Sequence, residues 1–503
     1  MGWRARWAEH HTVEVEGGSD AGDFLPSEPP KVFPRYLAPA GRGEIARRAA
    51  EIGWVVAKRF GPLGLRTART RDVAELTPEA FARPLRQTFE DLGTTFMKFG
   101  QLVASSPGIF GDEISGEFRS CLDTGPAVPF DVVRRVVEAD LGMALTDAFL
   151  RFDEVPIGRA SIAVVHRAEL PDGTEVAVKV LRPGVERRVS VDMDLFQPLL
   201  ELVARTTGEY IAGQMLQMFD GFRLQLGEEL DLRNEARAIE HMRRLLGLVD
   251  LPLVTVPQVY PELSGMRVLT MEFLDGVPVD DLQRIESFGY DPAPVVIQTV
   301  KGFLLTTIRW GFFHGDVHAG NLLLLRDGRL GVIDWGIVGR LDHDTHMFFR
   351  HIVEAGLGDQ EAWPKIAELT TRTYGPIMAD LGLSTEELAQ IMQVALDPLL
   401  RSPFGQVSLA EVISTPQRVV AERRGYELEK LTAGAIFKRF REQRKLRLKI
   451  EAEGINESEF ERGTFLLTKA LMYFERYGKM YMADSSLFED EEFFRTALDQ
   501  PIA

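Results

Sequence analysis

The stretch Trp310–Arg340, WGFFHGDVHAGNLLLLRDGRLGVIDWGIVGR, decides the fold of this 503-residue chain. An apolar run leads into a loop, residues 314–321, which begins with His-Gly-Asp and ends with Asn321 and is called the HGD loop below. Two apolar segments joined by an Asp-Gly turn follow within residues 322–333 and predict a β-hairpin. The hairpin ends at Asp334, which lies thirteen residues after Asn321 (334 − 321) and precedes Trp-Gly. This order of loop, hairpin and second acidic residue is typical of a phosphoryl-transfer site.

The residue types in this stretch suit phosphoryl transfer. A phosphoryl group carries negative charge on its oxygens while it moves, so a divalent cation must be held against it. Mg²⁺ prefers hard oxygen ligands, and the carboxylate of Asp334 and the side-chain carbonyl of Asn321 supply two of them. Asp316 can orient or deprotonate the acceptor hydroxyl. The structural alternative is a buried Asp that caps a loop beside an ordinary Asp-Trp-Gly turn, but the joint spacing favours the phosphoryl-transfer site.

Length and composition limit the classes of protein that fit. A chain of 503 residues is too long for one core, so two or three domains are expected. The formal net charge of −17 argues against general nucleic-acid binding, although local amides and cations can still hold ATP. The single cysteine, Cys121, cannot form an intramolecular disulfide, which together with the lack of a secretory signal predicts a cytoplasmic protein. No run of eighteen apolar residues occurs, so no transmembrane helix is expected.

The first 150 residues separate into a tail and a helical region. Residues 1–40 are polar and rich in Gly, Pro and acidic residues, which predicts a flexible tail. Apolar residues then recur at helical spacing, and six between Leu76 and Val103 form one stripe: Phe81, Leu85, Phe89, Leu92, Phe96 and Phe99. The same stretch carries Lys98 and Gln101, whose spacing alone indicates only a solvated helix face.

A β-hairpin that carries a lysine is predicted next. Ser161–Glu169 and Glu175–Leu181 read as strands around a Pro-Asp-Gly turn. The second strand contains Lys179 in Val-Ala-Val-Lys, the pattern of a strand lysine that binds nucleotide phosphates. Small residues near the start of the first strand let the backbone approach phosphates closely. The candidate nucleotide-binding residues there are Gly158, Arg159, Ala160 and Ser161.

A partner for this lysine is expected on a long predicted helix, Tyr210–Leu248. A phosphoryl-transfer site of this kind needs a helical Glu that pairs with the strand lysine, and Glu229 and Glu235 are the candidates. Glu235 follows Lys179 by 56 residues (235 − 179), so additional structure is expected between them. The alternative for both glutamates is an ordinary acidic helix face.

Two short strands are predicted within residues 256–273, and the second runs into Met-Glu-Phe-Leu-Asp-Gly. Its position in the order suits a hinge between two lobes, where the backbone of Glu272 and Phe273 would contact adenine. A plain edge strand is the alternative.

The motifs in this order resemble those of the UbiB/AarF-domain family of atypical protein-kinase-like proteins. The resemblance covers roughly Leu76–Leu341, with weaker similarity in the helix Thr464–Tyr481. The segments that carry it are LGTTFMKFGQ (92–101), PIGRASIAVVHRA (156–168), VAVKV (176–180), EELDLRNEA (228–236), FFHGDVHAGN (312–321) and VIDWG (332–336). It implies an α+β, protein-kinase-like fold of two lobes. The expected divisions are a flexible tail (1–40), a helical N-terminal extension (41–150), an N-lobe with inserted helices (151–275) and an enlarged helical C-lobe (276–503).

The resemblance also implies roles for residues whose spacing is uninformative. Lys98 and Gln101 would belong to the KxGQ motif, on an extension that covers the active site and points at the nucleotide. Glu229 and Asp231 would form the ExD motif, with Glu229 paired to Lys98. A helix over the cleft would make the protein a poor protein kinase.

By the same resemblance Glu235 pairs with Lys179, and the catalytic residues are Asp316, Lys179 and Glu235. The implied cofactors are ATP and Mg²⁺, and the implied reaction is phosphoryl transfer or ATP hydrolysis in support of isoprenoid-quinone or lipid metabolism. The chain departs from the family where residues 158–161 read Gly-Arg-Ala-Ser in place of an Ala-rich loop, and where Trp335 replaces Phe. Two alternatives are a small-molecule kinase of the aminoglycoside or choline kinase type, which lacks the KxGQ and ExD motifs, and a nucleotide-binding scaffold without turnover.

Residues 342–503 are predicted to form helices, namely His346–Ala355, Gln360–Tyr374, Thr385–Leu400, Leu409–Glu422 and Glu459–Met482. One segment, Phe437–Lys449, carries seven cations and one Glu. Such a run is usually a solvated helix face that pairs with acids of the same chain. The sharper hypothesis is peripheral contact with an anionic membrane, where lipid or a quinone precursor would be met.

Overall fold

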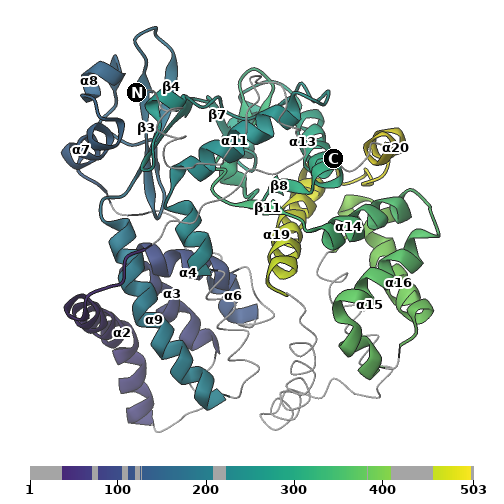
Figure 1. Cartoon of the computed structure of the whole chain (residues 1–503), viewed down its shortest axis with the longest axis horizontal. Helices are drawn as coiled ribbons and strands as arrows, with labels where there is room; N and C mark the ends of the chain where they lie inside the picture. The colour runs from purple at the N-terminus through teal and green to yellow at the C-terminus, as the bar shows by residue number, and fades with distance from the viewer. Residues whose placement is uncertain are drawn as a thin grey trace, which may run out of the picture.

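The computed structural model of the chain describes residues 37–70, 78–104, 112–118, 125, 127–207, 222–381, 383–408 and 457–499. These residues form a helical layer and two lobes, in agreement with the expected α+β, kinase-like class (Figure 1). Nearly all of the expected tail, the predicted helix Leu409–Glu422 and the basic segment Phe437–Lys449 lie outside the described residues.

The elements fall into three groups. The helical layer contains α2 (Arg42–Thr70), α3 (Pro78–Leu92), α4 (Thr94–Ala104), α6 (Asp112–Phe118) and α9 (Val185–Thr207). The N-lobe contains α7 (Phe130–Leu141), α8 (Leu145–Ala148), β1 (Arg151–Phe152), β2 (Gly158–Arg159), β3 (Ala163–Glu169), β4 (Glu175–Leu181), α11 (Leu232–Leu246), η2 (Pro261–Leu263) and β6 (Val268–Glu272). The C-lobe contains β5 (Val254–Thr255), β7 (Gly276–Pro278), α12 (Leu282–Glu286), α13 (Ala293–Trp310), β8 (Phe312–His314), η3 (Ala319–Asn321), β9 (Leu322–Leu325), β10 (Leu330–Val332), β11 (Val338–Arg340), α14 (His343–Gly356), α15 (Ala362–Leu381), α16 (Thr385–Arg401), η4 (Phe404–Gln406), α19 (Glu457–Tyr481) and α20 (Glu491–Asp499).

The N-lobe is built on a five-stranded antiparallel sheet in the order β1-β3-β4-β6, with β2 paired to β3. The strand β4 has the bounds that the sequence predicts, whereas β3 begins at Ala163, two residues later than predicted. The turn between them places Gly173 at a φ of +86°, a conformation that glycine adopts without strain.

The two faces of this sheet pack against different layers, which decides where Lys179 points. Val178 and Val180 of β4 belong to a core closed by α7 and α8. Ala177 and Leu181 belong to the larger core, which includes α11. Because side chains alternate along a strand, Lys179 shares the face of Ala177 and Leu181. The lysine therefore points toward α11 and away from α7 and α8.

Aromatic side chains hold the helical layer together. The Phe89 ring contacts those of Phe96 and Phe99 at centroid distances of 5.5 and 6.1 Å, and Phe99 contacts Phe222 at 5.3 Å. Of the apolar stripe predicted for this region, Leu92 and Phe96 are buried and Leu85, Phe89 and Phe99 are partly buried, whereas Phe81 is 41% exposed and does not belong to it. The stripe is also split into two helices, because Gly93 at a φ of +84° separates α3 from α4.

A buried ion pair joins this layer. The guanidinium of Arg48 on α2 lies 2.6 Å from the Asp192 carboxylate on α9 and donates to the Leu92 carbonyl at the end of α3. The Arg48 and Asp192 side chains are 4% and 0% exposed. Three helices therefore meet at one guanidinium group.

We expect Arg48→Met to lower the free energy of unfolding by about 3–5 kcal/mol, because Asp192 would remain buried without its cation. Arg59→Met is the matched control on the same helix, since the Arg59 and Asp91 side chains are 28% and 27% exposed and such pairs contribute about 1 kcal/mol or less. Urea unfolding of the two variants measures the difference. Equal losses of unfolding free energy would show that the buried pair stabilises the fold no more than the partly exposed one.

The predicted helix Tyr210–Leu248 is interrupted. Residues 222–229 are helical, the chain leaves the helix at residues 230–231, and α11 begins at Leu232. The Asp231 side chain accepts a hydrogen bond from the Arg233 backbone N–H, which caps α11 and starts a new helix there. The break places Glu229 and Glu235, the two candidate glutamates, on different helices.

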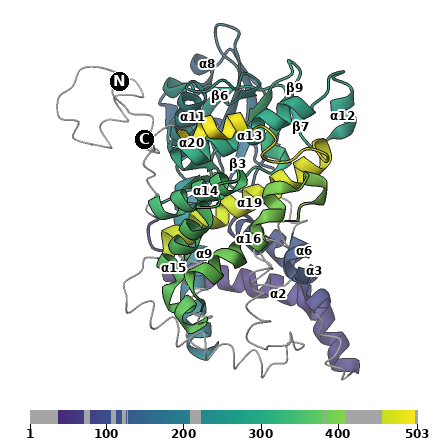
Figure 2. The same ribbon diagram turned by 90° about the vertical axis from the view of Figure 1, so that its right-hand side faces the viewer.

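The C-lobe is organised around α13, which is buried on most of its surface and packs against α14, α19 and α20. Gly311, with a φ of +59°, ends α13 and turns the chain into β8. A four-stranded sheet in the order β5-β10-β9-β7 and the pair β8-β11 carry the predicted hairpin and the start of the HGD loop. Figure 2 shows β7 and β9 of this sheet near one end of the molecule and α2 and α3 of the helical layer near the other.

Four predicted C-terminal helices appear as α14, α15, α16 and α19, with bounds that differ by up to seven residues at an end, and α20 was not predicted. Within the described part of the chain, no helix combines the length and the apolar character needed to cross a membrane.

Candidate functional site

The HGD loop is fixed to the end of the hairpin through His314. The strand β8 pairs with β11, which sets His314 opposite Val338. The His314 Nδ1 atom accepts the backbone N–H of Asp316 at 3.0 Å, and its Nε2–H donates to the Ile333 carbonyl at 3.1 Å. Burial lowers the pKa of His314, and a neutral ring, with one donor and one acceptor nitrogen, suits both bonds. The loop and the segment before Asp334 are therefore held in register by one ring.

Asn321 closes the loop from its other end. Its side-chain Nδ2–H donates to the Asp316 backbone carbonyl at 2.9 Å, and the backbone carbonyl of Asn321 accepts the Ile333 N–H at 2.9 Å. The side chain is buried. This bonding assigns the amide nitrogen to the loop, so the side-chain carbonyl is the atom that could bind a metal.

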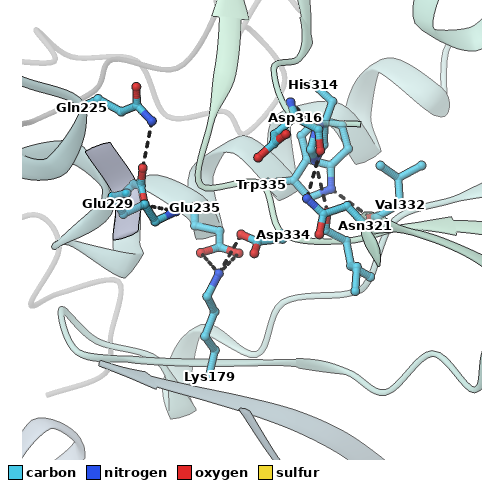
Figure 3. Close-up of polar contacts among 12 residues, drawn as sticks. Lys179, Gln225, Glu229, Glu235, His314, Asp316, Asn321, Val332, Asp334 and Trp335 are labelled. Atoms are coloured by element: carbon cyan, nitrogen blue, oxygen red, sulfur yellow. Dashed lines mark hydrogen bonds and ion pairs between the residues drawn. The ribbon is translucent and has the colours of Figure 1, made fainter. Parts of the chain in front are cut away.

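Asp334 is turned into the site by an unusual backbone conformation. Its φ is +57°, and no other non-glycine among the described residues has a positive φ. Trp335 anchors the turn, because its buried indole N–H donates to the Val332 carbonyl at 2.9 Å and its ring contacts His314 at 4.6 Å. With the indole inside the C-lobe, the Asp334 carboxylate points toward Lys179 (Figure 3). The strain of this conformation is of a kind found at functional sites.

Lys179 lies between two carboxylates. Its Nζ atom is 2.8 and 2.9 Å from the two oxygens of Glu235 and 2.8 Å from Oδ1 of Asp334 (Figure 3). The Lys179 and Glu235 side chains are 7% and 3% exposed, whereas that of Asp334 is 41% exposed. The predicted pairing of Lys179 with Glu235 is therefore present.

The charges of this cluster shift the pKa values of its members. Burial alone would lower the pKa of Lys179, but Asp334 and Glu235 raise it above its ordinary value. Removal of the carboxylate from water would raise the pKa of Asp334. The charge and hydrogen bond of Lys179, together with the more distant charge of Lys98, hold that pKa well below its ordinary value. Burial raises the pKa of Glu235 in spite of Lys179. The arrangement keeps the lysine charged and Asp334 ionised near neutral pH.

The second predicted pair brings the helical layer to the same place. Lys98 on α4 lies 3.0 Å from a carboxylate oxygen of Glu229, and Gln225 donates to the other oxygen at 3.0 Å. Asp231 caps α11 and also pairs with Arg233 at 2.6 Å. One pocket is lined by residues of α4, the N-lobe and the Asp334 turn: Lys98, Ala160, Ile162, Lys179, Glu228, Glu229, Asp231, Glu235, Asp334 and Gly336. Gln101 lies on α4, one turn beyond Lys98, and is outside this lining.

The candidate nucleotide-binding loop reaches the pocket only in part. Ala160 lines it, and the Ala160 carbonyl accepts from the Arg182 side chain at 2.9 Å. Arg159 is exposed and Gly158 partly exposed on β2, whereas Ser161 is buried. The Ser161 carbonyl accepts the Thr94 hydroxyl at 2.9 Å, which ties this loop to the first residue of α4.

The predicted hinge residues lie at the end of β6 and do not line this pocket. The Glu272 N–H donates to the Gln258 carbonyl at 2.8 Å, and the Phe273 N–H donates to the Glu175 carbonyl at 3.3 Å. These two N–H groups serve the sheet, so adenine contacts by their amides, one form of the hinge hypothesis, do not fit the structure.

Sequence reasoning missed Lys469 on α19. Its Nζ atom lies 2.8 Å from Oδ1 of Asp316. Eight residues later, the buried hydroxyl of Tyr477 donates to the carbonyl of Val317 at 2.9 Å. The only sequence signal was a lone lysine among apolar residues of a predicted helix, in a region of weak resemblance, and nothing there indicates contact with a loop 153 residues earlier (469 − 316).

The donor set can be tested for its fit to Mg²⁺. Asp334 supplies a partly exposed carboxylate and Asn321 a side-chain carbonyl, both hard oxygen ligands. The described residues contain no group of three or more His, Cys, Asp or Glu side chains suited to a metal ion. One carboxylate and one amide oxygen fit Mg²⁺, which is commonly held by one or two carboxylates together with substrate phosphates and water. They do not fit a closed structural metal site.

Comparisons with known proteins find similarity to atypical kinase-like proteins. The family model described as the ABC1 atypical kinase-like domain matches residues 120–365. An uncharacterized aarF domain-containing protein kinase, chloroplastic, from Arabidopsis thaliana is 32% identical over 412 residues, which cover 81% of this chain and 73% of that protein. An uncharacterized protein of Mycobacterium tuberculosis is 37% identical over 338 residues, which cover 66% of this chain and 67% of that protein. A probable protein kinase UbiB of Xylella fastidiosa is 31% identical over 371 residues, which cover 73% of this chain and 64% of that protein.

Proposed function

Because this chain belongs to the UbiB/AarF family of ABC1 atypical kinase-like proteins, we propose that it binds Mg-ATP and acts as a phosphotransferase or ATPase. The observation that carries the proposal is the cluster at Lys179, in which one ammonium group contacts both Glu235 and Asp334. Such a cluster places a fixed cation beside a metal-binding carboxylate, which is what nucleotide phosphates require.

Each residue of the proposed site, including Asn321 and Asp316 of the HGD loop, then has a distinct role. Lys179, held by Glu235, would contact the nucleotide phosphates, and Asp334 and Asn321 would hold Mg²⁺. When bound, the metal ion would neutralise charge on the transferred phosphoryl group. Asp316, on the HGD loop, would orient or deprotonate the acceptor. All of these groups except Asp316 and Asn321 come from different elements, which the two lobes and the Asp334 turn bring together.

The position of Lys98 supports the UbiB type over the small-molecule kinase alternative. Lys98 lines the same pocket as Lys179 and Asp334 and pairs with Glu229. The helix α4 of the helical layer therefore fills the space beside the expected phosphate site, where a peptide substrate would otherwise bind. We infer that the acceptor is a small or lipidic molecule, such as a quinone precursor, or water. The basic segment 437–449, which lies outside the described residues, would bring the protein peripherally to an anionic membrane where such acceptors reside.

We expect the purified protein to hydrolyse ATP in the presence of Mg²⁺ and to leave generic protein substrates unphosphorylated. Phosphate release is measured with and without anionic liposomes and a quinone-precursor mimic, and incorporation of labelled phosphate into casein is measured in parallel. Asp316→Asn is the control with strongly reduced turnover, because it removes the base and keeps the shape of the side chain. Robust labelling of casein by the wild-type chain would contradict a covered cleft. A Mg-ATP thermal shift without hydrolysis under any condition would favour a nucleotide-binding scaffold.

A further inference from the structure

The helix α19 contacts the HGD loop at two consecutive residues. Lys469 forms an ion pair with the Asp316 carboxylate at 2.8 Å, and the two side chains are each 19% exposed. The Tyr477 hydroxyl donates to the Val317 carbonyl at 2.9 Å, and Tyr477 is 1% exposed. Residues eight apart on a helix lie on one broad face, so the same face of α19 supplies both contacts. A helix far from the HGD loop in the sequence therefore helps to hold the loop in place.

The two contacts act on different parts of the loop. The backbone of Asp316 is fixed by His314, which accepts its N–H, and by Asn321, which donates to its carbonyl. Those bonds leave rotation of the Asp316 side chain undetermined. Among the described residues, the ion pair with Lys469 is the salt bridge that this carboxylate makes. Its direction is therefore set by a residue of α19 and not by the HGD loop.

The charge of Lys469 also offsets the burial of Asp316. The Lys469 ammonium lies 2.8 Å from this carboxylate, and both side chains are only 19% exposed, so the pair is largely shielded from solvent. A carboxylate held ionised and in one direction is the form that accepts a proton from, or aligns, an acceptor hydroxyl.

We propose that Lys469 is a positioning residue of the phosphoryl-transfer site, which orients the Asp316 carboxylate through a direct ion pair. The inference rests on the proposed function, because Asp316 is placed there as the residue that faces the acceptor. It extends the functional set to a helix that none of the sequence motifs includes. Two competing roles are a surface ion pair without effect on turnover and an inhibitory contact that withholds Asp316 from the acceptor.

The test compares Lys469→Met, Lys469→Arg and Lys479→Met in Mg-ATP hydrolysis. Lys479 is the matched control, because it lies on the same helix and, among the described residues, its ion pair is with Glu475 at 2.6 Å, away from the HGD loop, with side chains 42% and 18% exposed. For Lys469→Met we expect kcat to fall roughly 10- to 100-fold while KM for ATP changes little, since Lys469 contacts no residue assigned to the nucleotide. Lys469→Arg, which keeps the charge, should recover most of kcat, and Lys479→Met should match the wild type.

A double-mutant cycle shows whether Lys469 acts through Asp316. If it does, Lys469→Met combined with Asp316→Asn will be no slower than Asp316→Asn alone, and the shift in urea midpoint caused by Lys469→Met will shrink in the Asp316→Asn background. Unchanged or raised kcat in Lys469→Met, with the wild type active, would overturn the inference. Additive losses in the double variant would overturn it as well. If instead the wild type shows neither turnover nor a Mg-ATP thermal shift, the proposed function itself fails, and the urea cycle still reports whether the ion pair exists.

Discussion

Asp334→Asn is expected to abolish Mg²⁺-dependent nucleotide binding and to lower turnover by roughly 100- to 1,000-fold or more, the scale of losses seen when one key electrostatic group is removed from an active site. The substitution removes the charged ligand that would hold the metal ion and keeps the size of the side chain. It also weakens the contact between Lys179 and position 334 at 2.8 Å. The backbone can keep its φ of +57°, because Asn tolerates this region about as well as Asp.

The measurement is a thermal-shift titration with ATP at increasing Mg²⁺, followed by hydrolysis at saturating nucleotide. Asp327→Asn is the matched control, since Asp327 lies in the exposed turn of the same hairpin and pairs with Arg329 at 2.7 Å. An Asp334→Asn protein that retains the wild-type affinity for Mg-ATP would show that the metal is held elsewhere.

Lys179→Met is expected to lower the free energy of unfolding by about 3–5 kcal/mol, as well as to abolish phosphate binding. The stability loss follows because Glu235 is 3% exposed and would be left in the protein interior without its cation. If that is the cause, the double variant Lys179→Met with Glu235→Met should regain most of the lost stability, since an apolar pair of similar volume often replaces a buried ion pair without loss. Nucleotide binding should stay lost in both proteins.

Urea unfolding and a Mg-ATP thermal shift separate these two effects. The control is Arg135→Met, because Arg135 and Asp131 form an exposed pair on α7 whose side chains are 68% and 60% exposed; a change within about 1 kcal/mol is expected. A double variant less stable than Lys179→Met would mean that Glu235 has partners beyond Lys179 that depend on its charge.

The sequence was informative where chemistry and structure are local. The hairpin that leads to Asp334 and the bounds of β4 follow from short patterns of apolar and turn residues. Alternation along β4 places Lys179 on the same face as Ala177 and Leu181, but only the structure shows that this face meets α11. The pairing of Lys98 with Glu229 came from a family resemblance alone, because a lysine and a glutamate on two helix faces carry no signal of each other.

The sequence was less informative where a backbone bond or a distant element decides the outcome. The break before α11 depends on one capping bond of Asp231, within a stretch whose apolar periodicity continues on both sides. The two N–H groups at the hinge donate to the carbonyls of Gln258 and Glu175, which periodicity does not reveal. The contact of Lys469 with Asp316 joins residues far apart in the chain, and single-sequence patterns record only near neighbours.

The two contacts between α19 and the HGD loop have a consequence for the order in which the protein is synthesised and folds. Ribosomes add about 5–20 residues per second, and Lys469 follows Asp316 by 153 residues (469 − 316), so roughly 8–30 s pass before the nascent chain contains the lysine. Once Asp334 has also been added, both lobes can begin to fold with every motif residue present, while the Asp316 carboxylate still lacks its partner. Completion of the site is therefore timed by translation of the C-terminal part of the chain, and a ribosome-bound fragment that ends before α19 should carry the nucleotide cluster without an oriented Asp316.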